Sequence, residues 1–261
     1  MKKQRYFYII NLQFLGFRFS GWQKQPNQKT IEGMLSKTLK FILPETSFKI
    51  LGAGRTDSKV SALDAAFELF LEDSPITDFP GFLELFNRNL PSDIRAMGIR
   101  PVDESYNIIK DPKAKEYIYL FSYGKKNHPF SAPFLTNILE DLNIDAMKEA
   151  AKLFEGTHNF SAYTVKSKKN AGESRNIKSC GISKNTLLKA NFFPEESYAL
   201  RVIGRGFMRY QIRMMMGALF QLGKGELTIS DIENSLTDEN KLHLTYVAPG
   251  SGLMLYNLDL Y

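Results

Sequence analysis

The chain has 261 residues, of which 43% are hydrophobic and 24% are charged. This balance is typical of a globular protein with a sizeable core, arranged as one large domain or two ordinary ones, and argues against disorder. The 34 lysines and arginines outnumber the 28 acidic residues, so the net charge of +6 is compatible with nucleic-acid binding without establishing it.

The composition also bears on location and on metals. Cys180 is the single cysteine, which excludes an intrachain disulfide and favours a reducing compartment. The start of the chain lacks the apolar segment of a signal peptide, and no apolar run approaches the length of a membrane span. We therefore expect a cytoplasmic protein without membrane association. Three histidines and one cysteine make a zinc deaminase site improbable, and we expect no metal.

The first half of the chain predicts six elements. Residues 5–14 alternate between apolar and polar side chains, as a half-buried strand does. Thr30 is a typical N-cap for a helix whose apolar stripe reaches Ile42 and ends before Pro44. Further segments predict strands at 48–51, 64–71 and 94–100 and a helix at 80–89. This order of elements is found in ferredoxin-like and RNA-recognition folds.

The second half predicts a similar order. Its first strand, 115–123, carries aromatic side chains on one face, and its last helix, 209–222, has a core-facing stripe that includes methionines. Between and after them we expect a helix at 144–154 and strands at 176–183, 187–191, 198–203 and 253–260. The polar linker 102–112 is the expected seam, which gives the domains 1–104 and 105–261. The predicted fold class is α+β, with two ferredoxin-like halves forming an extended, mostly antiparallel sheet with flanking helices and a central cleft.

The stretch LGAGRTDSKVSA, residues 51–62, carries the most chemistry. Gly52 and Gly54 allow a sharp turn or the close approach of a ligand, and Asp57 follows them. Arg55 and Lys59 place positive charge beside this carboxylate, which favours its ionised form and attracts a polyanion. The pattern suggests a nucleophile or general base acting on a nucleotide. A turn or helix-capping role is the common alternative for an aspartate in this context.

This stretch resembles the GRTDxGVHA signature of the TruA family of tRNA pseudouridine synthases. The family's glycine and histidine are replaced here by Lys59 and Ser61, whereas the other signature residues fit: Arg55, Thr56, Asp57, Val60 and Ala62. The resemblance implies that Asp57 is the catalytic nucleophile.

Other segments resemble the family in the same order along the chain. Gly21-Trp22-Gln23 matches its GWQ motif, and residues 87–94 match its NxxLPxDI stretch. Residues 114–119 match an AxxYxY pattern, which implies that Tyr117 contacts the target base. Residues 206–217 match a helix whose arginine, here Arg213, pairs with the catalytic aspartate. Residues 248–253 match the APxxGL closure, which implies that Leu253 lines the pocket.

One family segment differs. Where an FxARFxA pattern supplies an arginine that assists base flipping, this chain has Tyr106 to Pro112, with Ile109 and no arginine. Lys110 is the residue that could partly substitute. The departures at Lys59, Ser61 and Ile109 bear on the RNA path and target position more than on the chemistry.

The resemblance implies an isomerase that converts uridine to pseudouridine in tRNA, in the region of the anticodon stem-loop. The chemistry needs no cofactor, because the glycosidic bond is broken and the base is rejoined without redox change or hydrolysis. Arg55, Lys59 and Lys110 would bind the RNA, and family members form homodimers across which tRNA lies. Two basic stretches, 197–225 and 165–184, agree with a polyanionic partner but could also be solvated faces.

Two rival functions stay open. One is a non-catalytic RNA-binding protein that retains the fold. The other is a nucleoside hydrolase or glycosidase that uses Asp57 and Asp64 as a carboxylate pair and releases free base.

Overall fold

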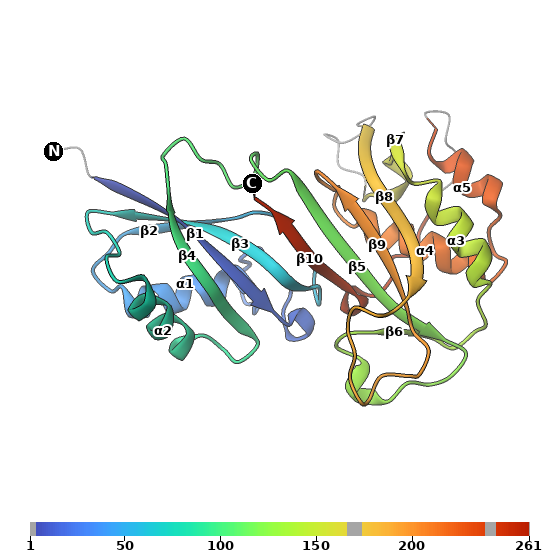
Figure 1. Cartoon of the computed structure of the whole chain (residues 1–261), viewed down its shortest axis with the longest axis horizontal. Helices are drawn as coiled ribbons and strands as arrows, with labels where there is room; N and C mark the ends of the chain where they lie inside the picture. Colours follow the sequence, from blue (N-terminus) through green and yellow to red (C-terminus); the bar gives the residue numbers. More distant parts are fainter. Residues whose placement is uncertain (1–3, 166–173, 238–243, 261) are drawn as a thin grey trace. The chain divides into compact units, whose positions relative to one another are not determined.

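The computed structural model describes residues 4–165, 174–237 and 244–260. Five α-helices and ten β-strands lie within these ranges, which confirms the α+β class (Figure 1). The chain divides into two compact units: Met1–Lys113 with Leu255–Tyr261 is unit 1, and Ala114–Met254 is unit 2. Part of the predicted basic stretch 165–184, residues 166–173, lies outside the described residues. In the described ranges, no helix has both the length and the apolar character needed to cross a membrane.

The sheet of unit 1 is built around β1 (Arg5–Phe14), which pairs antiparallel with β3 (Ser61–Glu72) and with β4 (Ile94–Val102). The short strand β2 (Phe48–Gly52) pairs with β3, also antiparallel. The end of β10 (Leu253–Asp259) joins this sheet, where the Leu258 N–H donates to Asp64 Oδ2 at 3.0 Å. Helices α1 (Ile31–Ile42) and α2 (Phe79–Asn89) lie on one face of the sheet (Figure 1).

The predicted alternation of β1 is confirmed over most of its length, since one face is buried from Tyr8 to Phe14 and the polar residues opposite are partly exposed; Ile9 is the exception. Tyr8 faces α2 and meets Phe79 edge-to-face, with ring centroids 6.0 Å apart. Ile9, on the opposite face, is fully buried in a cluster that includes Ile108. The linker between β4 and the second half therefore covers the second face of the sheet instead of running free in solvent. The alternation of apolar and polar residues in β1 does not indicate that this linker packs on the sheet.

The predicted start of α1 is confirmed. Thr30 has extended backbone, and its side chain accepts a hydrogen bond from the Gly33 N–H at 3.2 Å, as an N-cap does. The predicted stripe packs inward at Ile31, Leu35 and Leu39, which are buried. This helix fixes the end of the loop that precedes it, and that loop forms part of the candidate site.

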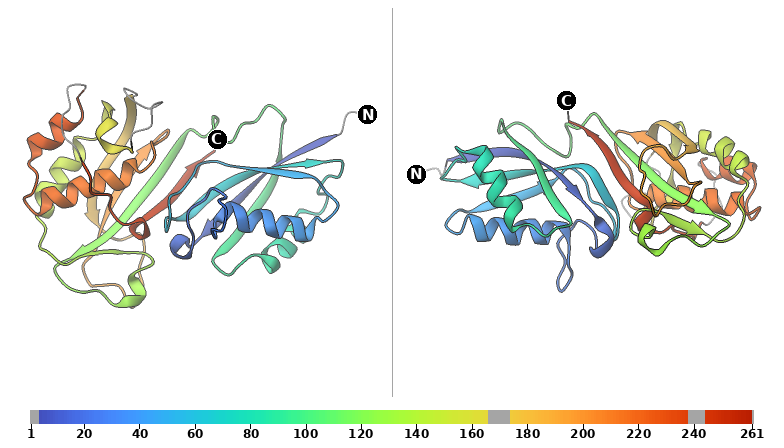
Figure 2. Two further views of the ribbon diagram at one scale, coloured as in Figure 1. Left: turned by 180° about the vertical axis from the view of Figure 1, so that it is seen from behind. Right: turned by 60° about the horizontal axis from the view of Figure 1, so that its bottom comes forward.

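Within unit 2, the strands β5 (Ala114–Tyr123), β9 (Tyr198–Gly204), β8 (Ser174–Lys184) and β7 (Gly156–Asn159) are successive antiparallel neighbours in the ten-stranded sheet of the chain. A short strand, β6 (Thr136–Ile138), runs parallel to β5. Helix α4 (Gln211–Gly223) crosses one face of this sheet, as the view from behind in Figure 2 shows. Helix α3 (Ile144–Lys152) packs against α4, and the short α5 (Ile229–Ser235) packs against α3.

One strand predicted in unit 2 was wrong. Residues 187–191 belong to a loop between β8 and β9, because Asn185 captures the backbone that a strand would need for pairing. Its side-chain oxygen accepts hydrogen bonds from the N–H groups of Leu187 and Leu188 at 3.1 and 3.2 Å. The strands β6 and β7 and the helix α5 were not predicted, since each is shorter than the window over which periodicity is visible.

Candidate active site

Asp57 lies on the loop that joins β2 to β3 in unit 1. The Val60 N–H donates to the Asp57 carbonyl at 3.2 Å and closes a β-turn. Lys59 occupies the third position of this turn with a φ of 66°. A positive φ at that position is the mark of a type II turn, which glycine adopts at the lowest cost. The Asp57 side chain is half-buried at the start of this turn, whereas Arg55 and Lys59 are exposed.

A second loop, residues 15–30, holds the backbone of the Asp57 loop in place. The Trp22 N–H donates to the Thr56 carbonyl at 3.0 Å, and the Lys59 N–H donates to the Phe19 carbonyl at 3.1 Å. The buried Ser61 hydroxyl accepts from the Gly16 N–H at 2.9 Å. These bonds lie before, within and after the turn, so the position of Asp57 is fixed by a neighbouring loop and not by local sequence alone.

Two glycines permit this close approach. Gly21 has a φ of 96°, and a Cβ on it would lie 2.8 Å from the Thr56 carbonyl oxygen. A Cβ on Gly52 would lie 2.5 Å from the indole ring of Trp22. The sequence analysis assigned Gly52 to a turn or to ligand approach; the structure instead shows that it makes room for a tryptophan. The GWQ segment and the aspartate loop are therefore one packed assembly.

The flank of this assembly carries positive charge over aromatic rings. The Lys59 ammonium lies 5.5 Å from the ring centroid of Phe17. Arg18 forms a two-bond ion pair with Asp93, with distances of 2.8 and 2.9 Å. The hydrogen bond from Arg18 lowers the pKa of the Asp93 carboxyl. Arg18 is thus occupied in tying the second loop to the start of β4, while Arg55 and Lys59 extend toward solvent.

In unit 2, the half-buried Arg213 lies on the first turn of α4. Its Nε donates to the Ala248 carbonyl at 2.7 Å, and the Ala248 N–H donates back to the Arg213 carbonyl at 3.1 Å. The guanidinium carbon lies 5.2 Å from the ring centroid of Tyr210, a cation–π contact. Tyr210 has a φ of 65°, so the chain turns sharply just before the helix. The arginine is therefore oriented from two sides by its own unit.

Tyr117 and Leu253 also belong to unit 2. Tyr117 on β5 is half-buried, and its ring meets Phe207 edge-to-face with centroids 5.4 Å apart. Tyr119, two residues on, is fully buried; its hydroxyl donates to the Pro249 carbonyl at 2.8 Å, and burial raises its pKa. Leu253 is buried at the start of β10. Of the two tyrosines, Tyr119 thus belongs to the core, whereas Tyr117 is partly exposed.

Lys110 lies on the linker that covers the sheet of unit 1. Its N–H donates to the Asn107 side-chain oxygen at 3.2 Å, and its side chain is exposed. The neighbouring Ile109 is 58% exposed, whereas Ile108 points into the core. The linker is therefore ordered by a turn at Asn107, with Lys110 on its outer side.

The predicted site residues divide between the units. Unit 1 brings Arg55, Asp57 and Lys59 together on one loop and holds Lys110 on its linker. Unit 2 holds Tyr117, Arg213 and Leu253. The sequence analysis missed the supporting roles of Gly21, Ser61 and Tyr210. A positive φ at a tyrosine has no sequence signal, but the GWQ match could have directed attention to Gly21.

Known proteins resemble this chain over nearly its whole length. Residues 150–259 match the family model described as tRNA pseudouridine synthase. The tRNA pseudouridine synthase A of Thermosipho melanesiensis is 32% identical over 253 residues, covering 96% of this chain and 98% of that protein. The synthase A of Aquifex aeolicus is 30% identical over 250 residues, covering 95% and 97%. The chain belongs to the TruA family of tRNA pseudouridine synthases. It is accordingly an isomerase that converts uridine to pseudouridine in RNA, with tRNA as its substrate class.

Family membership gives the two departures in the aspartate motif a structural explanation. The usual TruA glycine would suit the left-handed position that Lys59 occupies here at a φ of 66°. The usual histidine is replaced by Ser61, whose hydroxyl satisfies the buried N–H of Gly16. Both replacements thus fit the backbone of this loop, and relative to the family pattern they change the charge and bulk beside Asp57.

Asp64, the partner of Asp57 in the hydrolase alternative, serves the fold. One of its carboxylate oxygens accepts the Leu258 N–H and attaches the last strand to β3. Within the described ranges, no three His, Cys, Asp or Glu side chains are grouped closely enough to hold a metal ion.

Proposed function

We propose that this enzyme isomerises uridine in the anticodon stem-loop region of tRNA, with Asp57 as the nucleophile. The observation that carries the proposal is the fixed turn: its backbone is bonded at Thr56, Lys59 and Ser61 by one neighbouring loop. A nucleophile held in this way loses little freedom on meeting its substrate, which lowers the barrier to attack.

The reaction breaks the N1–C1′ bond, rotates the base and forms a C5–C1′ bond; the proton leaves C5, and N1 gains one. Asp57 would attack either C1′ of the ribose or C6 of the base, and both routes need an ionised carboxylate. Arg213, oriented by Ala248 and Tyr210, would pair with that carboxylate. Tyr117 would stack on the flipped base.

The remaining predicted residues have supporting roles in this proposal. Arg55, Lys59 and Lys110 are exposed cations that would contact phosphates, and Leu253 would line the pocket. We assign the aspartate motif to a catalytic half, residues 1–104, and the tyrosine strand and arginine helix to a second half, residues 105–261. The pairing order β4-β1-β3-β2 with two helices on one face supports a ferredoxin-like first half. A cytoplasmic homodimer that binds tRNA across both subunits completes the proposal.

The decisive experiment measures tritium release from C5-labelled uridine in unmodified tRNA. Asp57→Ala and Asp57→Asn should abolish release while tRNA binding persists. Asp64→Asn is the matched control, because it changes a nearby carboxylate that serves the fold, and it should retain release. The proposal fails if Asp57→Asn still turns over. Free uracil as product would support the hydrolase, and tight tRNA binding without release in the wild type would support the non-catalytic RNA-binding protein. Carbodiimide modification followed by primer extension locates the target uridine.

A further inference from the structure

An aromatic cluster outside the predicted site lies on two loops of unit 2. One loop, residues 124–135, follows β5, and the other, residues 185–197, joins β8 to β9. The cluster consists of five rings in a continuous chain of contacts, with centroids 5.1 to 6.4 Å apart: His128, Phe130, Phe134, Phe192 and Phe193. Phe130 is 69% exposed and His128 is exposed, so the outer rings do not serve the core.

Both loops are ordered by asparagine side chains. In the first, the side-chain Oδ1 of Asn137 accepts from the Asn127 backbone N–H at 3.0 Å, and its side-chain Nδ2 donates to the Lys125 carbonyl at 2.8 Å. In the second, Asn185 accepts from two backbone N–H groups and donates to the Leu188 carbonyl at 2.8 Å. The rings are therefore presented in a fixed arrangement, which reduces the entropy lost when a partner binds.

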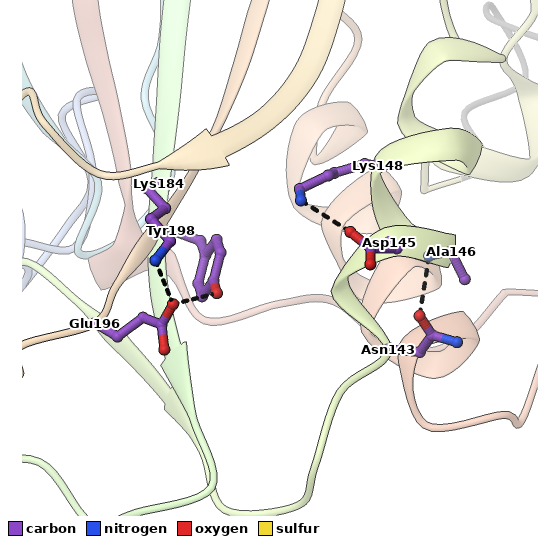
Figure 3. A network of polar contacts seen from close by, with 7 residues as sticks. All are labelled: Asn143, Asp145, Ala146, Lys148, Lys184, Glu196 and Tyr198. Carbon is purple, nitrogen blue, oxygen red and sulfur yellow. Dashed lines mark hydrogen bonds and ion pairs between the residues drawn. The ribbon is translucent and has the colours of Figure 1, made fainter.

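The two loops and their flanking residues carry a net positive charge. Residues 123–135 and 184–198 contain four lysines and two glutamates. Glu196 accepts from the Tyr198 hydroxyl at 2.7 Å and from Lys184 at 3.0 Å, as Figure 3 shows, and the Tyr198 hydrogen bond lowers the pKa of Glu196. Lys125, Lys126 and Lys189 are exposed. An exposed aromatic surface edged by lysines matches the chemistry of unpaired nucleotides, in which bases stack and phosphates attract cations.

We infer that this cluster is a second RNA-binding surface, on which Phe130 stacks with an unpaired base of the tRNA substrate. The inference rests on tRNA being the substrate. A second copy of the chain fits less well, because a two-fold contact at this surface would bring the lysines of both copies together. The surface would add affinity without taking part in the chemistry.

The test compares tRNA binding by Phe130→Ala, Phe130→Leu and Phe130→Tyr in the full-length enzyme, using one unmodified tRNA transcript at fixed salt. Loss of a stacked base should weaken binding by about 5- to 150-fold in the alanine variant. The leucine variant should also be weak, and the tyrosine variant should bind like the wild type. Phe41→Ala is the matched control, since Phe41 is 72% exposed on α1 of the other unit, and it should leave binding unchanged.

Two further measurements separate the outcomes. Lys125→Ala with Lys126→Ala should reduce the slope of log affinity against log salt by about 1.4, the value for two phosphate contacts to a single strand. Because binding is measured without turnover, these results do not depend on whether Asp57 is the nucleophile. Unchanged affinity in both Phe130→Ala and Phe130→Leu would overturn the inference. So would a change of oligomeric state in sedimentation of Phe130→Ala, because the surface would then bind a second copy.

Discussion

Replacing Lys59 with glycine tests the conformation of the turn that carries Asp57. Lys59 has a φ of 66°, where a side chain costs about 1–2 kcal/mol, whereas glycine adopts this conformation freely. Glycine loses more entropy on folding, by about 0.5–1 kcal/mol, and the contact of Lys59 with Phe17 is also lost. These costs make a comparison with Lys59→Ala more informative than a comparison with the wild type.

Lys59→Ala removes the same charge and the same ring contact but keeps the Cβ. We expect Lys59→Gly to be more stable than Lys59→Ala by about 1 kcal/mol, a difference of about 2–4 °C in Tm. Urea unfolding and calorimetry of the two variants measure the difference. Both should bind tRNA equally weakly, since both lack the cation. Equal stability of the two variants would refute the argument that the turn favours glycine here.

Two more substitutions test the support of the site and of the sheet. Gly21→Ala should reduce kcat by about tenfold or more, because the added Cβ would lie 2.8 Å from the Thr56 carbonyl and displace the loop. Gly98→Ala is the control, since no atom lies within 4 Å of its added Cβ, and it should match the wild type. Single-turnover assays compare the two variants. Burial raises the pKa of Glu68 above its ordinary value of 4.5, so its contribution to stability is complete below that pH and lost as pH rises through the folded pKa. Glu68→Gln should therefore gain stability over the wild type increasingly between pH 4.5 and neutrality in urea unfolding; a difference independent of pH would contradict this assignment.

The long periodic elements could be predicted from sequence because burial on one face leaves a regular pattern. The Thr30 cap and the stripe of α1 are examples. The prediction at 187–191 failed because its leucines lie in a loop whose backbone is held by Asn185, a competing local interaction. The burial of Ile9 on the second face of β1 could not be predicted, since it depends on where a distant linker packs.

Only those residues of the candidate site that belong to family motifs could be predicted from the sequence. The family resemblance named Asp57, Tyr117 and Arg213, and the structure shows how each is supported within its own unit. The interactions that support these side chains depend on backbone geometry, which no sequence motif encodes. Examples are the left-handed conformation of Tyr210 and the hydrogen bond from the Gly16 N–H to the Ser61 hydroxyl. Sequence motifs therefore predict the side chains of a site more readily than they predict the backbone interactions that hold those side chains in position.

The packing of Trp22 has a spectroscopic consequence. It is the single tryptophan of the chain, and it is 4% exposed. Its backbone N–H donates to the carbonyl of Thr56, the residue immediately before Asp57. Its ring also fills the space left by Gly52 on the other side of the same loop. The tryptophan emission of the unlabelled enzyme, excited at wavelengths that tyrosine absorbs weakly, therefore comes from one indole next to the loop that carries Asp57. Any rearrangement of that loop when RNA binds can be followed in real time by the emission of a probe that the chain already carries.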